Sequence, residues 1–248
     1  QAVNDWFDRH VDAINEPQRP IPSGRMPGRW GLYVALVWTL LSLAVSTLLG
    51  PWGFGAAVVG LALAWAYSAP PLRLKRNGWW GCLACGICYE GLAWVTGGAV
   101  MAGGQAPATA SLLLAALYSA GALGIMALND FKAIEGDRQT GIGSLPVRLG
   151  VRGAAQAACV IMTVPQVIVV GLLVFWGQPL HALGIVGLLV GQGLMMKRFL
   201  ADRVGHRRLL LLGLSIFLAG SVLAAFSPSA VALIATRALM AVGAAMAM

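Results

Sequence analysis

Eight apolar runs, each long enough or nearly long enough to cross a lipid bilayer, dominate this chain of 248 residues. A spanning helix needs about 20 mostly apolar residues. The chain is 58% hydrophobic and only 10% charged, which leaves too few polar residues to cover a soluble domain of this size. The sequence therefore predicts an all-α, polytopic transmembrane helix bundle in a lipid bilayer. The runs lie at about 30–49, 53–69, 80–100, 109–128, 153–175, 181–197, 209–226 and 230–248.

Lysine and arginine occur at alternate ends of these runs. The basic segments are 9–29, 73–76, 132–152 and 197–208, whereas the turns near 50–55, 102–109, 176–181 and 227–229 contain neither residue. By the positive-inside rule, the basic ends face the cytoplasm. Membrane topology thus explains the net charge of +8, and no nucleic-acid partner is expected.

The acidic residues are concentrated in two clusters more than a hundred residues apart. Seven of the nine belong to them: Asp5, Asp8, Asp12, Glu16, Asp130, Glu135 and Asp137. Each cluster adjoins a long apolar run at a basic, cytoplasmic end. We therefore expect one site on the cytoplasmic side that two helices assemble.

The first cluster suits a divalent cation. On a helix that advances ~100° per residue, Asn4, Asp5, Asp8 and Asp12 fall within a stripe about 100° wide. Oxygen ligands one turn apart favour Mg²⁺, and like charges so close together need a cation between them. An N-terminal solvated face is the alternative, which the scarcity of acids elsewhere disfavours. In the second cluster, Asp130 and Asp137 share a face if the helix continues through Gly136.

A basic loop lies between the two clusters in the sequence. Arg73 and Lys75 follow Tyr67 and Ser68 closely, which favours phosphate binding, whereas Arg76 could equally bind anionic lipid head groups. Acids that bind Mg²⁺, cations that neutralise a diphosphate and an apolar cavity behind them suit an isoprenoid diphosphate. Such a cavity would also protect an allylic cation from water.

Three cysteines, Cys82, Cys85 and Cys88, have the C-x-x-C-x-x-C spacing that can hold an iron–sulfur cluster. They lie in an apolar run rich in glycine and alanine, and no fourth ligand is nearby. Packing is therefore the favoured interpretation.

The chain resembles the intramembrane prenyltransferases of the UbiA superfamily, within it the chlorophyll and bacteriochlorophyll synthases. The resemblance rests on Asn-Asp-Trp-Phe-Asp-Arg from position 4, Arg-Pro-Ile-Pro-Ser-Gly from 19, Tyr-Ser-Ala-Pro-Pro-Leu-Arg-Leu-Lys from 67 and Asn-Asp-Phe-Lys-Ala-Ile-Glu-Gly-Asp-Arg from 129. Ser-Leu-Pro from 144 belongs to the same pattern. The second and fourth segments are the most specific.

The resemblance implies nine spanning helices around a central cavity, in a bacterial inner, photosynthetic membrane, with the active site facing the cytoplasm. The implied reaction joins a geranylgeranyl or phytyl group from its diphosphate to the propionate carboxylate of bacteriochlorophyllide. Asn4, Asp8 and Asp12 would bind one Mg²⁺, and Asp130 and Asp137 the other, with Asp5 and Glu135 as further candidates. The catalytic acids would be Asp8, Asp12, Asp130 and Asp137. The expected diphosphate-binding residues are Tyr67, Ser68, Arg73, Lys75, Lys132 and Arg138.

The resemblance to a synthase covers about residues 1–198. This part is expected to be N-terminally incomplete, without the first helix and most of the second. Residues 199–248 resemble a fragment of a major facilitator transporter, which favours a foreign two-helix tail over an unusual ninth helix. Two other functions stay open: prenylation of an aromatic ring, and a non-enzymatic role as a pigment-binding or transporter fragment.

Overall fold

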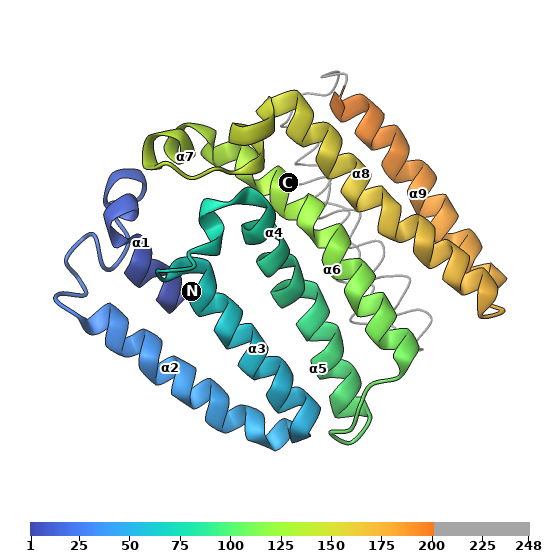
Figure 1. The fold of residues 1–248 in the computed structure, drawn as a ribbon, viewed down its shortest axis with the longest axis horizontal. Coiled ribbons are helices and arrows are strands. Elements are labelled where there is room, and N and C mark those ends of the chain that lie inside the picture. Colours follow the sequence, from blue (N-terminus) through green and yellow to red (C-terminus); the bar gives the residue numbers. More distant parts are fainter. Residues whose placement is uncertain (201–248) are drawn as a thin grey trace. The chain divides into compact units, whose positions relative to one another are not determined.

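A computed structural model describes residues 1–200, and its regular elements there are helices (Figure 1). The chain divides into two compact units, Gln1–Leu172 and Leu173–Met248. Except for its first two residues, the expected foreign tail lies outside the described residues. In the second unit, the described part contains the end of α8 and the whole of α9 (Pro179–Leu200).

The first unit begins with the helix that carries Asp5, Asp8 and Asp12 of the first acidic cluster. Its helices are α1 (Ala2–Asn15), α2 (Trp30–Ser46), α3 (Gly50–Ser68), α4 (Gly78–Gly86), α5 (Leu92–Met101), α6 (Thr109–Asn129), α7 (Ile134–Thr140) and α8 (Leu145–Phe175), which ends in the second unit. Short 3₁₀ segments are Thr47–Leu49, Leu74–Arg76 and Asp130–Ala133, and a π-helical turn, Ile87–Gly91, joins α4 to α5.

Five helical stretches of the described chain are long and apolar enough to span a membrane. One of them, Trp30–Ser68, reverses direction at Gly50, so that α2 and α3 run antiparallel (Figure 1). The first six predicted runs are thus confirmed as helices. The helix expected at 153–175 begins earlier, at Leu145, and is interrupted at Gly150 (φ 71°, ψ 164°). Large apolar side chains such as Leu48 point outward, as expected in lipid.

The reversal between α2 and α3 depends on the absence of a side chain at Gly50. Its φ of 75° lies in the left-handed region, which L-residues rarely adopt. A Cβ atom there would lie 2.5 Å from the Cα atom of Gly104, in the turn that leads to α6. Close backbone contact therefore joins two turns at the end of the unit opposite the polar one.

Small residues make up the centre of the first unit. One buried cluster consists of Cys82 from α4, Ala127 from α6, and Leu145, Ala154 and Ala158 from α8, and all of these except Leu145 are small. Such residues let helix backbones approach closely, which is how helices associate where lipid removes the hydrophobic driving force.

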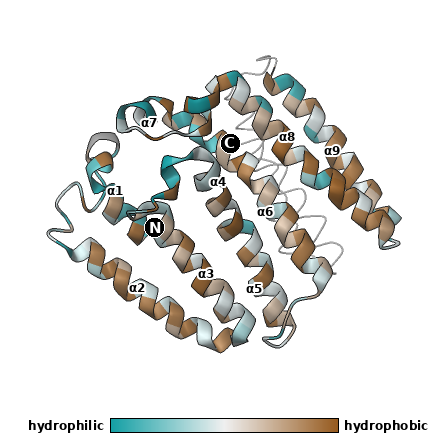
Figure 2. Ribbon diagram, viewed as in Figure 1, coloured by the Kyte–Doolittle hydropathy of each residue, from teal (hydrophilic) through white to brown (hydrophobic). Residues whose placement is uncertain are grey.

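Hydrophilic residues gather at one end of the first unit. Figure 2 shows them on α1, on the segment that precedes α4 and around α7, whereas the long helices are mostly apolar. The two acidic clusters and the basic loop therefore meet at the same end of the bundle. This arrangement confirms the expected multi-pass helical architecture and positions the site.

Candidate active site

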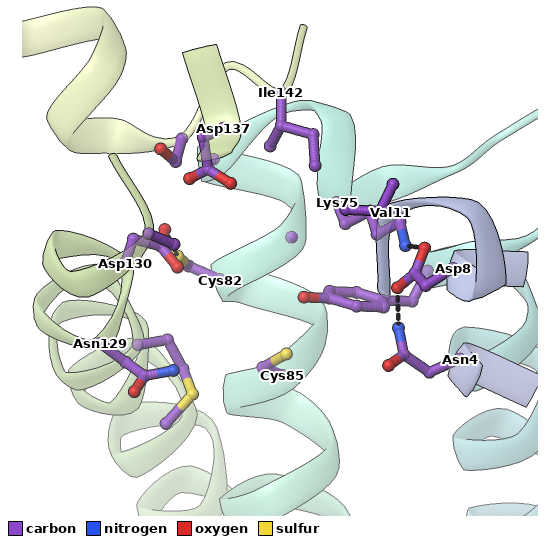
Figure 3. Close-up of a pocket in the computed structure, with 16 residues that line it drawn as sticks. Asn4, Asp8, Val11, Lys75, Cys82, Cys85, Asn129, Asp130, Asp137 and Ile142 are labelled. Carbon is purple, nitrogen blue, oxygen red and sulfur yellow. Dashed lines mark hydrogen bonds and ion pairs between the residues drawn. The ribbon is translucent and has the colours of Figure 1, made fainter. Parts of the chain in front are cut away.

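The N-terminal side of the site is built on α1. Asn4 and Asp8 lie one turn apart, and the Asn4 Nδ2 donates to the Asp8 Oδ2 (2.6 Å) and to the Ser68 Oγ (3.2 Å). The Asp8 carboxylate also forms an ion pair with Lys75, and its Oδ1 lies 3.9 Å from the Arg73 Nη2. Asp8 is therefore contacted by three side chains, two of them from the basic loop; Figure 3 shows the contacts with Asn4 and Lys75.

The basic loop holds its cations in an unusual backbone conformation. Arg73 is the one non-glycine residue of the described chain with positive φ (40°), a conformation that costs energy and recurs at functional sites. Its buried Nε has no hydrogen-bond partner among the described residues. The Lys75 side chain is only 8% exposed. Burial lowers the pKa of its ammonium to about 8, and the adjacent Asp8 carboxylate favours the charged form.

The opposite side of the site carries the second acidic cluster. Asp130 lies in the 3₁₀ turn after α6, and the Cys82 Sγ donates to its Oδ2 (3.6 Å). Asp137 lies in α7. The helix does not continue from Asp130 to Asp137, because Ala133 (φ −108°, ψ 5°) breaks it before Gly136. Both carboxylates nevertheless face the same cavity.

This cavity, which we call the acidic cavity, has a volume of about 270 Å³. In Figure 3, Asn4, Asp8 and Lys75 enter it from one side, and Asp130 and Asp137 from the other. The structure thus brings one acid of the first cluster, Asp8, and two of the second, Asp130 and Asp137, to the same cavity. The predicted residues in its lining are Asn4, Asp8, Tyr67, Lys75, Asp130 and Asp137.

Apart from Asp5 and Asp12, five predicted residues do not line the acidic cavity: Ser68, Arg73, Lys132, Glu135 and Arg138. Ser68 is buried, and its Oγ accepts a hydrogen bond from the Asn4 Nδ2. Arg73 does not line the cavity, but it forms an ion pair with the lining residue Asp8. The Glu135 Oε1 accepts a hydrogen bond from the Gln139 Nε2 on the exposed surface of α7 (2.9 Å). Lys132 lies within the second cluster in the sequence and Arg138 directly follows it, but neither contributes to the lining.

Asp5 and Asp12 belong to a different set of contacts. The Arg19 Nη1 lies 3.2 Å from the Asp5 Oδ1 and 3.1 Å from the Asp12 Oδ2, and the Arg19 Nε pairs with Glu16. Asp5, Asp12 and Arg19 line a separate cavity of about 440 Å³, together with Pro20, Pro22 and Trp38. Burial raises the pKa of Asp12, and Arg19 opposes this shift. Asp12 therefore anchors the loop after α1 in this structure.

The acidic cavity fits a hard divalent cation that shares its ligands with a substrate. Among the described residues, no three His, Cys, Asp or Glu side chains gather closely enough to hold a metal ion by themselves. The cavity instead offers an amide and a carboxylate on one side and two carboxylates on the other. Mg²⁺ is commonly bound by one or two carboxylates, with water and substrate phosphates completing its shell.

A larger cavity, which we call the apolar chamber, adjoins the acidic cavity. Its volume is about 880 Å³, and α2, α3 and the α4–α5 stretch supply most of its walls. Residues that line both cavities are Asn4, Tyr67, Cys85, Met126 and Asn129. A bound molecule can therefore have a charged head among the acids and an apolar body among the helices.

Sequence reasoning missed several lining residues. Cys82 and Cys85 were interpreted as packing residues, but they line the acidic cavity, and their i, i+3 spacing beside the basic loop was the available signal. Asn129 immediately precedes Asp130, as Asn4 precedes Asp5. Ser144 also belongs to the lining, and nothing in its spacing from the acids indicated this.

An apolar multi-pass bundle with a carboxylate-lined cavity at one end defines an integral membrane protein with a site for a charged, lipid-linked molecule. The chain belongs to the UbiA prenyltransferase family, whose model matches residues 1–208. The matched segment includes every residue of both cavities.

Curated relatives narrow the comparison within the family. A "Bacteriochlorophyll synthase 33 kDa chain" from Cereibacter sphaeroides is 60% identical over 205 residues, which are 83% of this chain and 68% of the relative. Its counterpart from Rhodobacter capsulatus is 53% identical, with the same shares covered. A "Chlorophyll synthase, chloroplastic" from Arabidopsis thaliana is 42% identical and is covered to 54%. No solved structure matches the chain.

Proposed function

We propose that this prenyltransferase transfers a geranylgeranyl or phytyl group from its diphosphate to the propionate carboxylate of bacteriochlorophyllide and releases pyrophosphate. One observation carries the proposal: Asn4 and Asp8 face Asp130 and Asp137 across a cavity that adjoins an apolar chamber. The 60% identity to a bacteriochlorophyll synthase supports the choice of acceptor.

The residues of the acidic cavity take distinct roles in this reaction. Asn4 and Asp8 on one side, and Asp130 and Asp137 on the other, would hold Mg²⁺, which neutralises the charge of the diphosphate when bound. Lys75 would neutralise further charge as the allylic C–O bond breaks and pyrophosphate leaves with the electron pair. The acceptor carboxylate then forms the ester bond. Because it is already ionised, the site needs no strong general base, and catalysis consists of ionisation and positioning.

The apolar chamber would hold the prenyl chain. Its walls contain Ala57, Gly60, Ala64 and Leu92, which offer the chain no polar partner. Exclusion of water from the chamber would protect an allylic cation from hydrolysis. The shared residue Tyr67 would lie where the diphosphate ends and the prenyl chain begins.

The protein is a multi-pass membrane protein, and we place its active site on the cytoplasmic side of a photosynthetic inner membrane. Support comes from the charge of the loops, since the segments at the acidic end carry the lysines and arginines, whereas the turns at the opposite end of the first unit carry none.

The test is a transfer assay on the purified chain in lipid nanodiscs, with geranylgeranyl diphosphate, Mg²⁺ and bacteriochlorophyllide. Homogentisate serves as an alternative acceptor that probes prenylation of an aromatic ring. Esterified pigment together with stoichiometric pyrophosphate supports the proposal. Prenylation of homogentisate alone would contradict it, and so would pigment binding without pyrophosphate release.

A further inference from the structure

The segment between α7 and α8 is attached directly to the basic loop. The Gly78 N–H donates to the Gly143 carbonyl oxygen (2.8 Å), and the Gly143 N–H donates to the Arg76 carbonyl oxygen (3.0 Å). Asn77 and Gly143 thereby form an isolated parallel β-bridge. We call residues 76–78 and 143–144 the clasp. It joins the loop that carries Lys75 to the segment that follows Asp137.

Close packing in the clasp fixes the position of Ser144. A Cβ atom at Gly78 would lie 2.9 Å from the carbonyl carbon of Ser144 and 2.5 Å from the backbone nitrogen of Leu145. Only glycine allows this approach without a shift of the backbone. Ser144 is 3% exposed, and it lines the acidic cavity.

The Ser144 hydroxyl has no partner that accounts for its burial. A serine directly before a helix usually accepts a hydrogen bond from an N–H of the first turn, but this hydroxyl forms no hydrogen bond with any described residue. The Asp137 carboxylate lies close enough to interact with the hydroxyl, although the two groups do not meet the geometry of a hydrogen bond. Because buried polar groups are nearly always paired, the hydroxyl is available for a bound molecule.

We propose that the Ser144 hydroxyl donates a hydrogen bond to a phosphate oxygen of the prenyl diphosphate, and so adds a ligand-binding residue to the site. This inference rests on the proposed function. A phosphate oxygen is a strong acceptor, and the clasp holds the hydroxyl and the Lys75 loop in one piece around the same cavity. The two groups would bind the diphosphate from adjoining positions.

The experiment measures equilibrium binding of a non-reactive analogue, geranylgeranyl thiolodiphosphate, to the full chain in nanodiscs with saturating Mg²⁺. Ser144→Ala is expected to weaken binding about tenfold, the loss typical of one hydrogen bond to a charged group. Geranylgeraniol, which lacks the diphosphate, is expected to bind both proteins equally. Ser119→Ala is the matched control, because Ser119 is also buried but its hydroxyl donates to the Ala115 carbonyl oxygen, away from both cavities.

Three results would overturn the inference alone: unchanged binding of the analogue by Ser144→Ala, equal weakening by Ser119→Ala, or parallel weakening toward geranylgeraniol. Ser144→Ala could instead shift the Mg²⁺ concentration for half-maximal binding and leave the affinity at saturating Mg²⁺ unchanged. That result would mean that the hydroxyl acts on Asp137 and not on the diphosphate, and it would also overturn the inference. Failure of the wild-type chain to bind the analogue would overturn the proposed function itself.

Discussion

The Asp8 carboxylate is the most heavily contacted acid of the site, with Asn4, Arg73 and Lys75 around it. Asp5, one turn along the same helix and paired with Arg19, is a natural control. Asp8→Asn is expected to lower pyrophosphate release by about 10²–10³-fold, because it removes a charged ligand from a metal-dependent site. Asp130→Asn should behave alike, and Asp5→Asn should retain most activity. Near-normal release by Asp8→Asn in folded protein would refute the two-sided site.

Asp12 tests whether an acid of the first cluster acts as a ligand or as an anchor. If its main partner is Arg19, Asp12→Asn and Arg19→Gln should have the same effect: a lower melting temperature, and activity reduced by no more than about tenfold. The Arg19 side chain is 31% exposed, and solvent screening limits a partly exposed ion pair to about 1 kcal/mol. A loss of turnover by Asp12→Asn as large as that of Asp8→Asn would instead assign Asp12 to the metal.

The helices were largely predictable, and so was the meeting of the two acidic clusters, because hydropathy and loop charge determine which ends share a side of the membrane. The sequence did not predict that the first cluster divides between two cavities, with Asp8 in one and Asp5 and Asp12 in the other. At ~100° per residue, Asn4 and Asp8 lie near 0° and 40°, whereas Asp12 and Asp5 lie near 80° and 100°. The stripe thus contains two pairs, Asn4 with Asp8 and Asp5 with Asp12. They differ in that Arg19 binds the second pair and not the first. The position of Arg19 depends on a loop of irregular structure, which periodicity does not predict.

At the scale of the helix, α3 offers a test of the apolar chamber. Ala64 lines it, and Ala62 on the same helix does not. Ala64→Leu is expected to raise the KM for geranylgeranyl diphosphate about tenfold, since excess volume in an occupied space typically costs about 1–3 kcal/mol. Geranyl diphosphate, whose chain is half as long, should be affected less.

Ala62→Leu is the matched control and should leave both KM values unchanged, because Ala62 is exposed as Ala64 is but does not line the chamber. Steady-state kinetics of both variants with geranylgeranyl and geranyl diphosphate test whether the prenyl chain occupies the chamber. An equal rise in KM for the two donors with Ala64→Leu would place the prenyl chain elsewhere.

At the scale of the whole chain, the residues of the acidic cavity and the apolar chamber all precede position 145. The family match ends at residue 208, and the segment 209–248 contains no acid, no lysine and only Arg237. Deletion of 227–248 is therefore expected to leave the specific transfer activity unchanged, as measured in nanodiscs. Loss of transfer by a stably folded deletion variant would contradict a foreign tail.

The ion pair between Lys75 and Asp8 has a consequence for how affinity should be interpreted. A diphosphate that enters the cavity must take Lys75 from a carboxylate that already neutralises it, so binding is an exchange of one counter-ion for another. The measured affinity for the diphosphate then reflects the attraction of Lys75 to the diphosphate minus its attraction to Asp8. Asp8→Asn, which is expected to lower turnover by about 10²–10³-fold, should therefore bind metal-free pyrophosphate more tightly than the wild-type chain does. This single substitution would therefore raise the affinity for pyrophosphate and lower the rate of catalysis.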